Sequence, residues 1–305
     1  MRITNNMMNT AFLQDLQRNL RNLDTMQRRI NSGKIVSRPS DDPVRLQQIL
    51  KLETALDQHQ QYIRNIDDAH AWLASTDAAL DQAGGIIVQV RGLAVQGANG
   101  TNDEGAMTAL ADEVRQLAEQ LVGVANATHA GRYIFAGNNT TEKPFQDISW
   151  PPDPEIGPLP YDGFQGNSNT MEYEIGPGVT MVVNTTAKMA FGEGDKEAIQ
   201  LLIDLENALR TDNKDEINNI LGKLEEVESQ FLTARSEVGA RMNRLEATKS
   251  RFTDDIITYT ALKSQVEDVD MAEAIMYLKT QEAVYHASLA VGARLMQPTL
   301  VDFLR

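Results

Sequence analysis

The chain of 305 residues contains no cysteine, so disulfide bonds and thiolate metal sites are excluded. Aromatic residues make up only 6%, and the formal net charge is −15. Because a nucleic-acid-binding protein needs a basic surface, this composition argues against nucleic acid as a partner. No apolar stretch approaches the length needed to span a bilayer, so we expect no membrane partner either.

The first twenty residues, MRITNNMMNTAFLQDLQRNL, lack the unbroken apolar core and the cleavage pattern of a secretory signal peptide. We therefore expect a cytosolic protein, unless it leaves the cell by a route that needs no cleaved signal. Residues 1–50 carry eight Arg or Lys against four Asp, whereas residues 266–305 carry three basic against six acidic residues. The two ends are complementary in charge, which suits pairing. With so few charged residues, chance is an equally good explanation of this difference.

The dominant pattern that is present is a 3–4 spacing of apolar residues, typical of helices that pack along a seam. Further runs of this kind cover residues 49–87, 107–124 and 217–266, and the last predicts a helix of about 75 Å. In the C-terminal stretch of residues 271–296, a second apolar line runs beside the seam and indicates partners on more than one side. This line consists of Val284, Val291 and Leu295. The seam near the N terminus consists of Leu13, Leu16, Leu20, Leu23 and Ile30, and the seam near the C terminus of Met271, Ile275, Leu278, Tyr285, Leu289 and Met296.

Residues 132–195 differ in character, because they hold most of the prolines and many glycines. MEYEI alternates apolar and acidic residues, GPG is a turn signal, and VTMVV is typical of a strand. We therefore predict a β-hairpin in a small inserted module.

These patterns together predict a mainly α fold, in which a long antiparallel helical bundle or coiled coil carries a small inserted β domain. The N- and C-terminal helices are expected to pair, which brings the two chain ends together. The expected organisation is a terminal coiled-coil layer of residues 1–42 and 266–305, a helical bundle of residues 43–131 and 196–265, and the inserted β domain of residues 132–195.

The stretch SRPSDDPV, residues 37–44, contains the adjacent carboxylates Asp41 and Asp42 between two helical patterns. Gly33 is placed to end the first helix in a left-handed conformation. Asp42 followed by Pro43 is a strong signal for the start of the next helix, because Asp caps and Pro suits the first turn. Capping is favoured over a magnesium or calcium site, since no further oxygen ligands are evident nearby.

Other candidate sites are weak. His59 and His70 lie about 16 Å apart on one helix, too far to share a metal ion, so we expect buried or partly buried seam histidines. No nucleophile, P-loop or dinucleotide motif is present. An enzyme would need a titratable cluster near Trp150, Asp162 and Glu172 of the β domain. We expect no enzyme, no cofactor and no metal.

Five stretches carry a resemblance to a known family: ITNNMM, INSGKIVSRPSDDPV, GRYIFAGNNTTEKPF, SEVGARMNRLEATKSRF and the ending LVDFLR. Together they resemble the flagellin-like axial proteins of bacteria. The stretch from Gly131 to Phe145 favours, within this family, the junction between hook and filament over flagellin itself. The alternatives are a flagellin proper and, less favoured, an intracellular coiled-coil scaffold.

The resemblance implies a structural adaptor that joins hook-associated protein 1 on the hook side to flagellin on the filament side, as a ring of identical subunits. It implies terminal helices that line a tube, and an interlayer loop at Asp41, Asp42 and Pro43 that also contacts a neighbouring subunit. It further implies unfolded export through the flagellar type III apparatus without a cleaved signal, an extracellular location in the flagellum, and a cytoplasmic chaperone that binds near the C terminus. Terminal helices that order only on assembly would follow.

Overall fold

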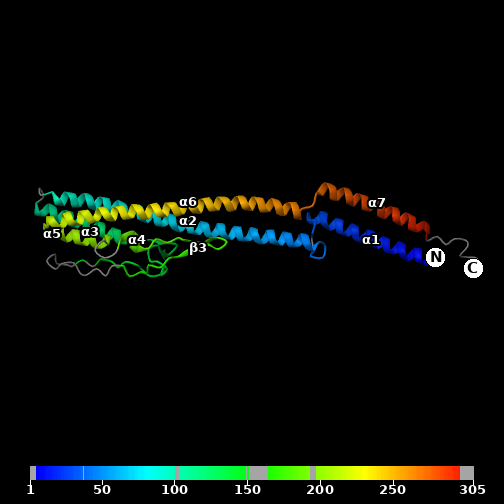
Figure 1. Cartoon of the computed structure of the whole chain (residues 1–305), viewed down its shortest axis with the longest axis horizontal. Coiled ribbons are helices and arrows are strands. Elements are labelled where there is room, and N and C mark those ends of the chain that lie inside the picture. The colour runs from blue at the N-terminus through cyan, green and yellow to red at the C-terminus, as the bar shows by residue number, and fades with distance from the viewer. Residues whose placement is uncertain are drawn as a thin grey trace, which may run out of the picture. The chain divides into compact units, whose positions relative to one another are not determined.

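The computed structural model describes residues 5–36, 38–99, 103–148, 150, 164–192 and 197–295. They divide into two compact units, a terminal unit of Met1–Gln58 with Asp254–Arg305, and a central unit of His59–Thr253. The elements in chain order (Figure 1) are α1 (Asn5–Ser32), α2 (Pro43–Ala98), α3 (Glu104–Ala125), β1 (Thr128–His129), β2 (Arg132–Tyr133), β3 (Glu172–Gly176), β4 (Val179–Val182), α4 (Ala187–Phe191), α5 (Ala198–Arg210), α6 (Lys214–Glu267) and α7 (Met271–Leu295).

In the central unit, ion pairs bridge α2 and α6, which run antiparallel. Arg91 lies 2.8 Å from Glu228, while Lys249 lies 2.6 Å from Asp67, further toward the start of α2. Between these pairs, Arg235 binds Asp81 at 2.6 Å and also reaches Asp77. Apolar side chains of both helices, including Leu73, Leu80, Leu224 and Val238, are fully buried in one hydrophobic core, and their burial stabilises the unit.

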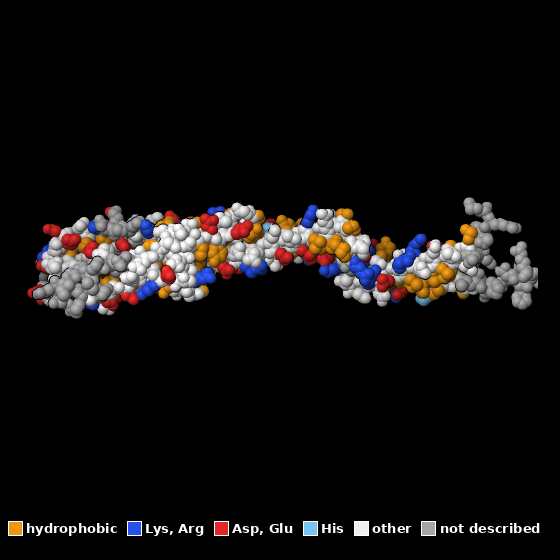
Figure 2. Space-filling view, turned by 90° about the horizontal axis from the view of Figure 1, so that it is seen from below, with side chains coloured by type: hydrophobic (Ala, Val, Ile, Leu, Met, Phe, Trp, Pro, Cys, Tyr) orange, Lys and Arg blue, Asp and Glu red, His pale blue; other side chains and the backbone are white. Residues whose placement is uncertain are grey.

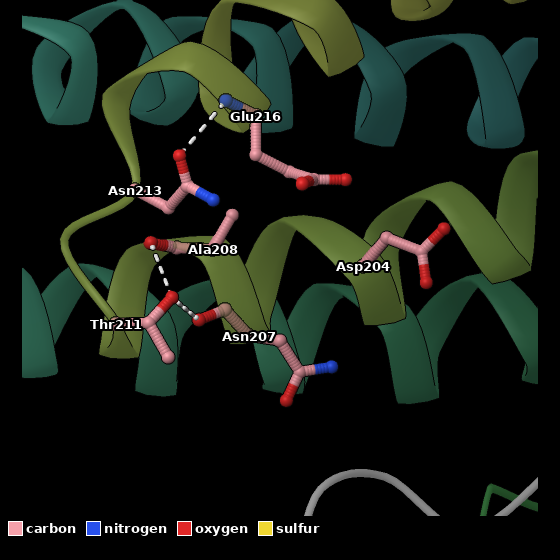
Figure 3. Close-up of a pocket in the computed structure, with 6 residues that line it drawn as sticks. All are labelled: Asp204, Asn207, Ala208, Thr211, Asn213 and Glu216. Carbon is pink, nitrogen blue, oxygen red and sulfur yellow. Dashed lines mark hydrogen bonds between the residues drawn. The ribbon is translucent and has the colours of Figure 1, made fainter.

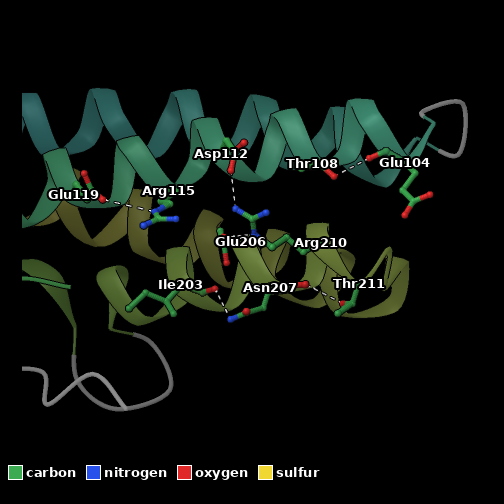
Figure 4. Close-up of polar contacts among 10 residues, drawn as sticks. All are labelled: Glu104, Thr108, Asp112, Arg115, Glu119, Ile203, Glu206, Asn207, Arg210 and Thr211. Carbon is green, nitrogen blue, oxygen red and sulfur yellow. Dashed lines mark hydrogen bonds and ion pairs between the residues drawn. The ribbon is translucent and has the colours of Figure 1, made fainter. Parts of the chain in front are cut away.

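The helix α3 begins at an Asp103 cap, whose carboxylate accepts from the Ala106 amide at 2.9 Å. Its predicted apolar spacing becomes a buried face that packs against α5 (Figure 4). Arg210 of α5 lies 2.6 Å from Asp112 of α3 and also pairs with Glu206, which is itself buried. These two hydrogen-bonded carboxylates raise the pKa of Arg210 although burial opposes the shift, so the guanidinium stays charged as it joins α3 to α5.

The inserted module is fastened to the helices by aromatic rings and asparagine side chains. Phe191 of α4 makes edge-to-face contacts with Phe135 at 5.1 Å and with Phe145 and Phe231 at 5.4 Å each. At the end of α3, the Asn126 side chain donates to the Phe145 carbonyl and accepts from its amide, both at 3.0 Å. The module is therefore part of the central core.

The predicted hairpin is present as β3 and β4, which pair antiparallel. The module differs from expectation in two respects. The pair β1 and β2 begins at Thr128, so the expected boundary at residues 131/132 falls within a strand pair. The short helix α4 also interrupts the β region.

Three helical expectations need correction. The apolar run expected at residues 49–87 underestimates its helix, since α2 continues through the glycine-containing stretch GLAVQGA to Ala98. Gly97 is buried and lets Leu209 of α5 approach closely, since an added β-carbon there would overlap that side chain. The helix α5 was not predicted, as its pattern is only 13 residues long. His70 is exposed, although a buried or partly buried position was expected, whereas His59 is half-buried against Phe252 at 4.8 Å.

The terminal unit contains α1, α7, the first turns of α2 and the last turns of α6. It therefore extends beyond the terminal layer expected at residues 1–42 and 266–305. Gly33 follows α1 with φ +70°, and its amide donates to the Arg29 carbonyl at 2.8 Å, which ends the helix as its sequence predicts.

Candidate assembly surface of the terminal helices

The helices α1 and α7 lie side by side and run antiparallel (Figure 1). Asn19 of α1 donates to the Ser288 hydroxyl of α7 at 3.4 Å. Nearer the start of α1, Phe12 meets Gly292, and beyond its end Lys34 pairs with Asp268 in an isolated antiparallel bridge. The pairing of the terminal helices that the sequence predicts is therefore present.

The predicted seam residues are shared between the partner helix and the solvent. Leu16, Leu23, Ile30, Leu278 and Tyr285 are half-buried, whereas the others remain exposed. Met296 lies outside the described residues. The exposed ones are Leu13 at 49%, Leu20 at 44%, Met271 at 43%, Ile275 at 46% and Leu289 at 40%. The pair thus covers only part of its apolar surface by itself.

A close contact between α1 and α7 involves two residues outside the predicted seam set, Phe12 and Gly292. A β-carbon on Gly292 would overlap the ring of Phe12, so the glycine forms a notch that receives this ring. Gly292 is buried and Phe12 is half-buried. A glycine within an apolar helix pattern often has such a packing role, and this was the available sequence signal.

A shallow hollow of about 350 Å³ opens beside this notch. It is mainly apolar. Figure 2 shows hydrophobic side chains gathered on one face of the terminal helices. Val284 and Val291, the predicted second apolar line, are exposed at 43% and 54%. The residues lining the hollow are Phe12, Asp15, Leu16, Val284, Ala287, Ser288 and Val291. An exposed apolar surface of this kind is typical of a site that contacts another protein.

The opposite charges of the two chain ends meet where Lys34 pairs with Glu267, and not through ion pairs between the described residues of α1 and α7. On α1, Arg18 pairs with Asp15 at 3.5 Å and Arg28 with Asp24 at 3.3 Å, both within the helix. On α7, Lys279 pairs with Glu282 at 2.9 Å, again within the helix.

The loop before α2 uses its two aspartates differently. Asp42 Oδ1 accepts from the amides of Val44 and Arg45 at 3.1 and 3.0 Å, as an N-cap does, and Pro43 is the first residue of the helix. Asp41 instead closes the preceding turn, because its carboxylate accepts from the Arg38 amide at 3.1 Å.

Close to this loop, the segment after α1 forms hydrogen bonds with the segment at the junction of α6 and α7. The Ile35 amide donates to the Glu267 carbonyl at 2.7 Å, and the Val269 amide to the Gly33 carbonyl at 2.9 Å. The Glu267 carboxylate is buried and pairs with Lys34 and, at 3.5 Å, with Lys263. This cluster was not predicted, because a single glutamate at a helix end carries no distinctive sequence signal.

Outside the terminal unit, the candidate site near the β domain is not assembled among the described residues. Trp150 lies under the guanidinium of Arg115, 4.9 Å from its ring, and Glu172 is exposed on β3. Asp162 lies outside the described residues. Among the parts of the chain that the structure describes, no group of three or more His, Asp or Glu side chains is arranged to hold a metal ion. No helix there is long and apolar enough to cross a membrane.

A polar hollow of about 250 Å³ lies at the turn between α5 and α6 (Figure 3). Several of its polar groups form local hydrogen bonds. Thr211 donates to the Asn207 carbonyl at 2.9 Å, and Asn213 accepts from the Glu216 amide at 3.3 Å, which caps α6. Asp204 accepts from Gln200 at 2.8 Å. The hollow thus results from two helix ends meeting at a turn.

The fold and the paired ends define a class of protein. The family model for the bacterial flagellin N-terminal helical region matches residues 3–140, and the model for the bacterial flagellin C-terminal helical region matches residues 221–304. The chain belongs to the flagellin family. Its members are structural proteins of the bacterial flagellum, and this chain is a component of the flagellar axial structure.

Two individual relatives are similar to this chain over most of its length. Flagellar hook-associated protein 3 of Escherichia coli is 25% identical over 283 residues, covering 85% of this chain and 86% of that protein. Flagellin of Bacillus subtilis is 24% identical over 308 residues, covering 95% of each.

Solved structures show the same fold. A putative flagellar hook-associated protein from Vibrio parahaemolyticus matches with a TM-score of 0.66 at 21% identity, over 75% of this chain and 100% of that one. Flagellar hook-associated protein 3 from Legionella pneumophila matches with a TM-score of 0.60 at 14% identity, over 72% of this chain and 98% of that one.

Proposed function

We propose that this protein is the structural adaptor at the junction between the flagellar hook and the filament. It joins hook-associated protein 1 on the hook side to flagellin on the filament side, and it acts as a ring of identical subunits. The observation that carries this proposal is the incompletely covered pair of α1 and α7, whose apolar side chains are available to neighbouring subunits. The similarity to hook-associated protein 3 over most of both chains supports the junction over other positions in the axial structure.

The binding energy of this adaptor comes from the terminal seams. Each exposed leucine or isoleucine that a neighbour covers contributes about 1.5–3 kcal/mol if it becomes fully buried. Several such residues per subunit, repeated around a ring, give strong assembly without any catalytic chemistry. The proposed role is therefore that of an assembly component and not of an enzyme. In this role, Asp41 and Asp42 hold the interlayer loop and also contact an adjacent subunit.

The proposed function also includes a route of export from the cell. The chain leaves the cell unfolded through the flagellar type III apparatus, without a cleaved signal, and reaches its place at the outer end of the hook. A cytoplasmic chaperone binds near the C terminus until export. The absence of cysteine supports this route, because no disulfide has to be reduced before the chain unfolds.

A flagellin proper is the second candidate, since Bacillus subtilis flagellin matches along nearly the whole chain. Copy number separates the two. We expect sheared and purified hook–filament complexes to contain this protein in a small, fixed number per filament, independent of filament length. An amount that rises in proportion to filament length, measured by quantitative mass spectrometry, would identify a filament subunit instead.

A further inference from the structure

We propose that Glu267, held by Lys34 and Lys263, fixes the register in which α1 pairs with α7. The proposal deepens the function proposed above and rests on it in one respect, because the register decides which side chains of the pair face a neighbouring copy. Glu267 is a positioning residue in this role, since it acts through the two connections that lead into the helices.

The seam between α1 and α7 specifies its own register weakly. Its apolar residues recur every seven positions, so a slip of one heptad brings equivalent side chains together again. Leu13 and Leu20 on one helix, and Ile275 and Leu289 on the other, are at least 40% exposed. A slipped pair would therefore lose little burial, and the correct register needs another determinant.

The bridge between the two connections supplies such a determinant at one end of the pair. Gly33 and Ile35 lie in the connection after α1, whereas Glu267 is the last residue of α6 and Val269 lies in the connection between α6 and α7. Their two main-chain hydrogen bonds, at 2.7 and 2.9 Å, hold the connections in an antiparallel bridge. A slip of α1 along α7 either breaks this bridge or has to be absorbed within a few residues.

The Glu267 side chain makes the bridge specific for one register of α1 against α7. It is only 7% exposed, and its carboxylate lies between the ammonium groups of Lys34 and Lys263. Lys263 is in turn 2.7 Å from Glu53 of α2, and this hydrogen bond raises the pKa of the Lys263 ammonium. A buried carboxylate is tolerated only with its partners in place. A slip of one heptad would carry Lys34 about 10 Å away and leave Glu267 with one partner.

In helical pairs, the best-attested role of a buried charged or polar group is to fix the register, at some expense of stability. The notch formed by Phe12 and Gly292 at the far end of the pair marks the same register. Glu267 provides the electrostatic determinant and the notch a steric one, so the two can be tested separately.

The absence of cysteine in the chain allows a direct test. The substitutions Asn19→Cys, Ser288→Cys and Gln281→Cys are introduced together in the full chain. Asn19 faces Ser288 in the observed register, whereas a slip of one heptad would bring it to Gln281. Mild oxidation traps whichever pairing is populated, and digestion followed by mass spectrometry gives the ratio of the two cross-links.

We expect the cross-link between positions 19 and 288 to dominate. Glu267→Gln should lower its ratio to the slipped cross-link about fivefold, the upper range for a partly exposed ion pair. Lys34→Met should act in the same direction but less, because Glu267 keeps Lys263. The matched control is Glu273→Gln, which changes an exposed carboxylate of α7 and should leave the ratio unchanged.

The proposal is overturned by a ratio that Glu267→Gln leaves unchanged, including a ratio near one in every variant. A lower melting temperature without a change in ratio would also contradict it, because it would make Glu267 a stabilising residue only. An equal change in the Glu273→Gln control would assign the effect to net charge. None of these results touches the proposed junction function, which is tested in cells.

Discussion

The ring of Phe12 occupies the space that a β-carbon on Gly292 would take. We therefore predict that Gly292→Leu, which fits a helix well, weakens the pairing of α1 and α7 by about 1–3 kcal/mol through overpacking. The measurement is the yield of the cross-link between Asn19→Cys and Ser288→Cys under fixed oxidation, with and without the substitution.

The double variant with Phe12→Ala should recover part of this loss, because the smaller side chain vacates the notch. Gly222→Leu is the control, since Gly222 of α6 has open space around it. Failure of Phe12→Ala to improve the yield of Gly292→Leu would show that the two residues do not act as a pair.

The Asp42 cap gives a prediction about stability. Asp42→Ala removes the acceptor for two amides at the start of α2 and should lower the free energy of unfolding by about 1 kcal/mol. Asp42→Asn keeps an acceptor and should lose much less. Urea unfolding followed by circular dichroism measures both. If Asp42→Ala left stability unchanged but abolished assembly, the carboxylate would serve a contact with a neighbouring subunit rather than the cap.

Glu197 gives a prediction about pH. Burial raises the pKa of its carboxyl group, and Oε1 has no hydrogen-bond partner among the described residues. The folded state thus binds the proton more tightly than the unfolded state, and stability is lost as pH rises through the folded-state pKa. Glu197→Gln should therefore stabilise the protein at neutral pH, with a gain that vanishes below the ordinary pKa of about 4.3.

Urea unfolding between pH 3.5 and pH 8 measures this difference. Glu225→Gln is the control, because Glu225 is exposed on α6 and its substitution changes the net charge equally. A gain for Glu197→Gln that is the same at both ends of the range would show that the carboxyl group is not the cause.

The isolated monomer should hold its terminal helices weakly. The seam residues that stay at least 40% exposed bury too little apolar area to offset the entropy of ordering two helices. Hydrogen exchange should therefore be fast in residues 1–30 and 275–305 and slow in α3 and α5, whose apolar faces are buried. Strong protection of both terminal segments in the monomer would contradict ordering on assembly.

The parts of the fold with long, regular patterns were predictable. The apolar spacing of α3 became a buried face, and the turn signal GPG joined the two strands of the hairpin. The helix α5 was missed because 13 residues give few repeats and its packing against α3 depends on contacts distant in sequence. The end of α2 was obscured by glycines that serve close packing, such as Gly97 against Leu209.

The candidate surface was predictable in outline but not in detail. Heptad spacing identified the helices that pair, since it depends only on positions along one segment. It did not identify Phe12, because this residue precedes the seam and its partner is a glycine near the other end of the chain. Lys34 and Glu267 form a cluster only after α1 and α7 pair, so neither has a signal that can be recognised in isolation.

The most direct test of the junction function is to delete the gene in the bacterium that encodes it. Hooks are then imaged by electron microscopy, and flagellin is measured in the medium. The adaptor hypothesis predicts intact hooks without filaments, together with soluble flagellin that leaks from the cells, and restoration of filaments by the wild-type gene. Normal filaments on the deletion strain would contradict it.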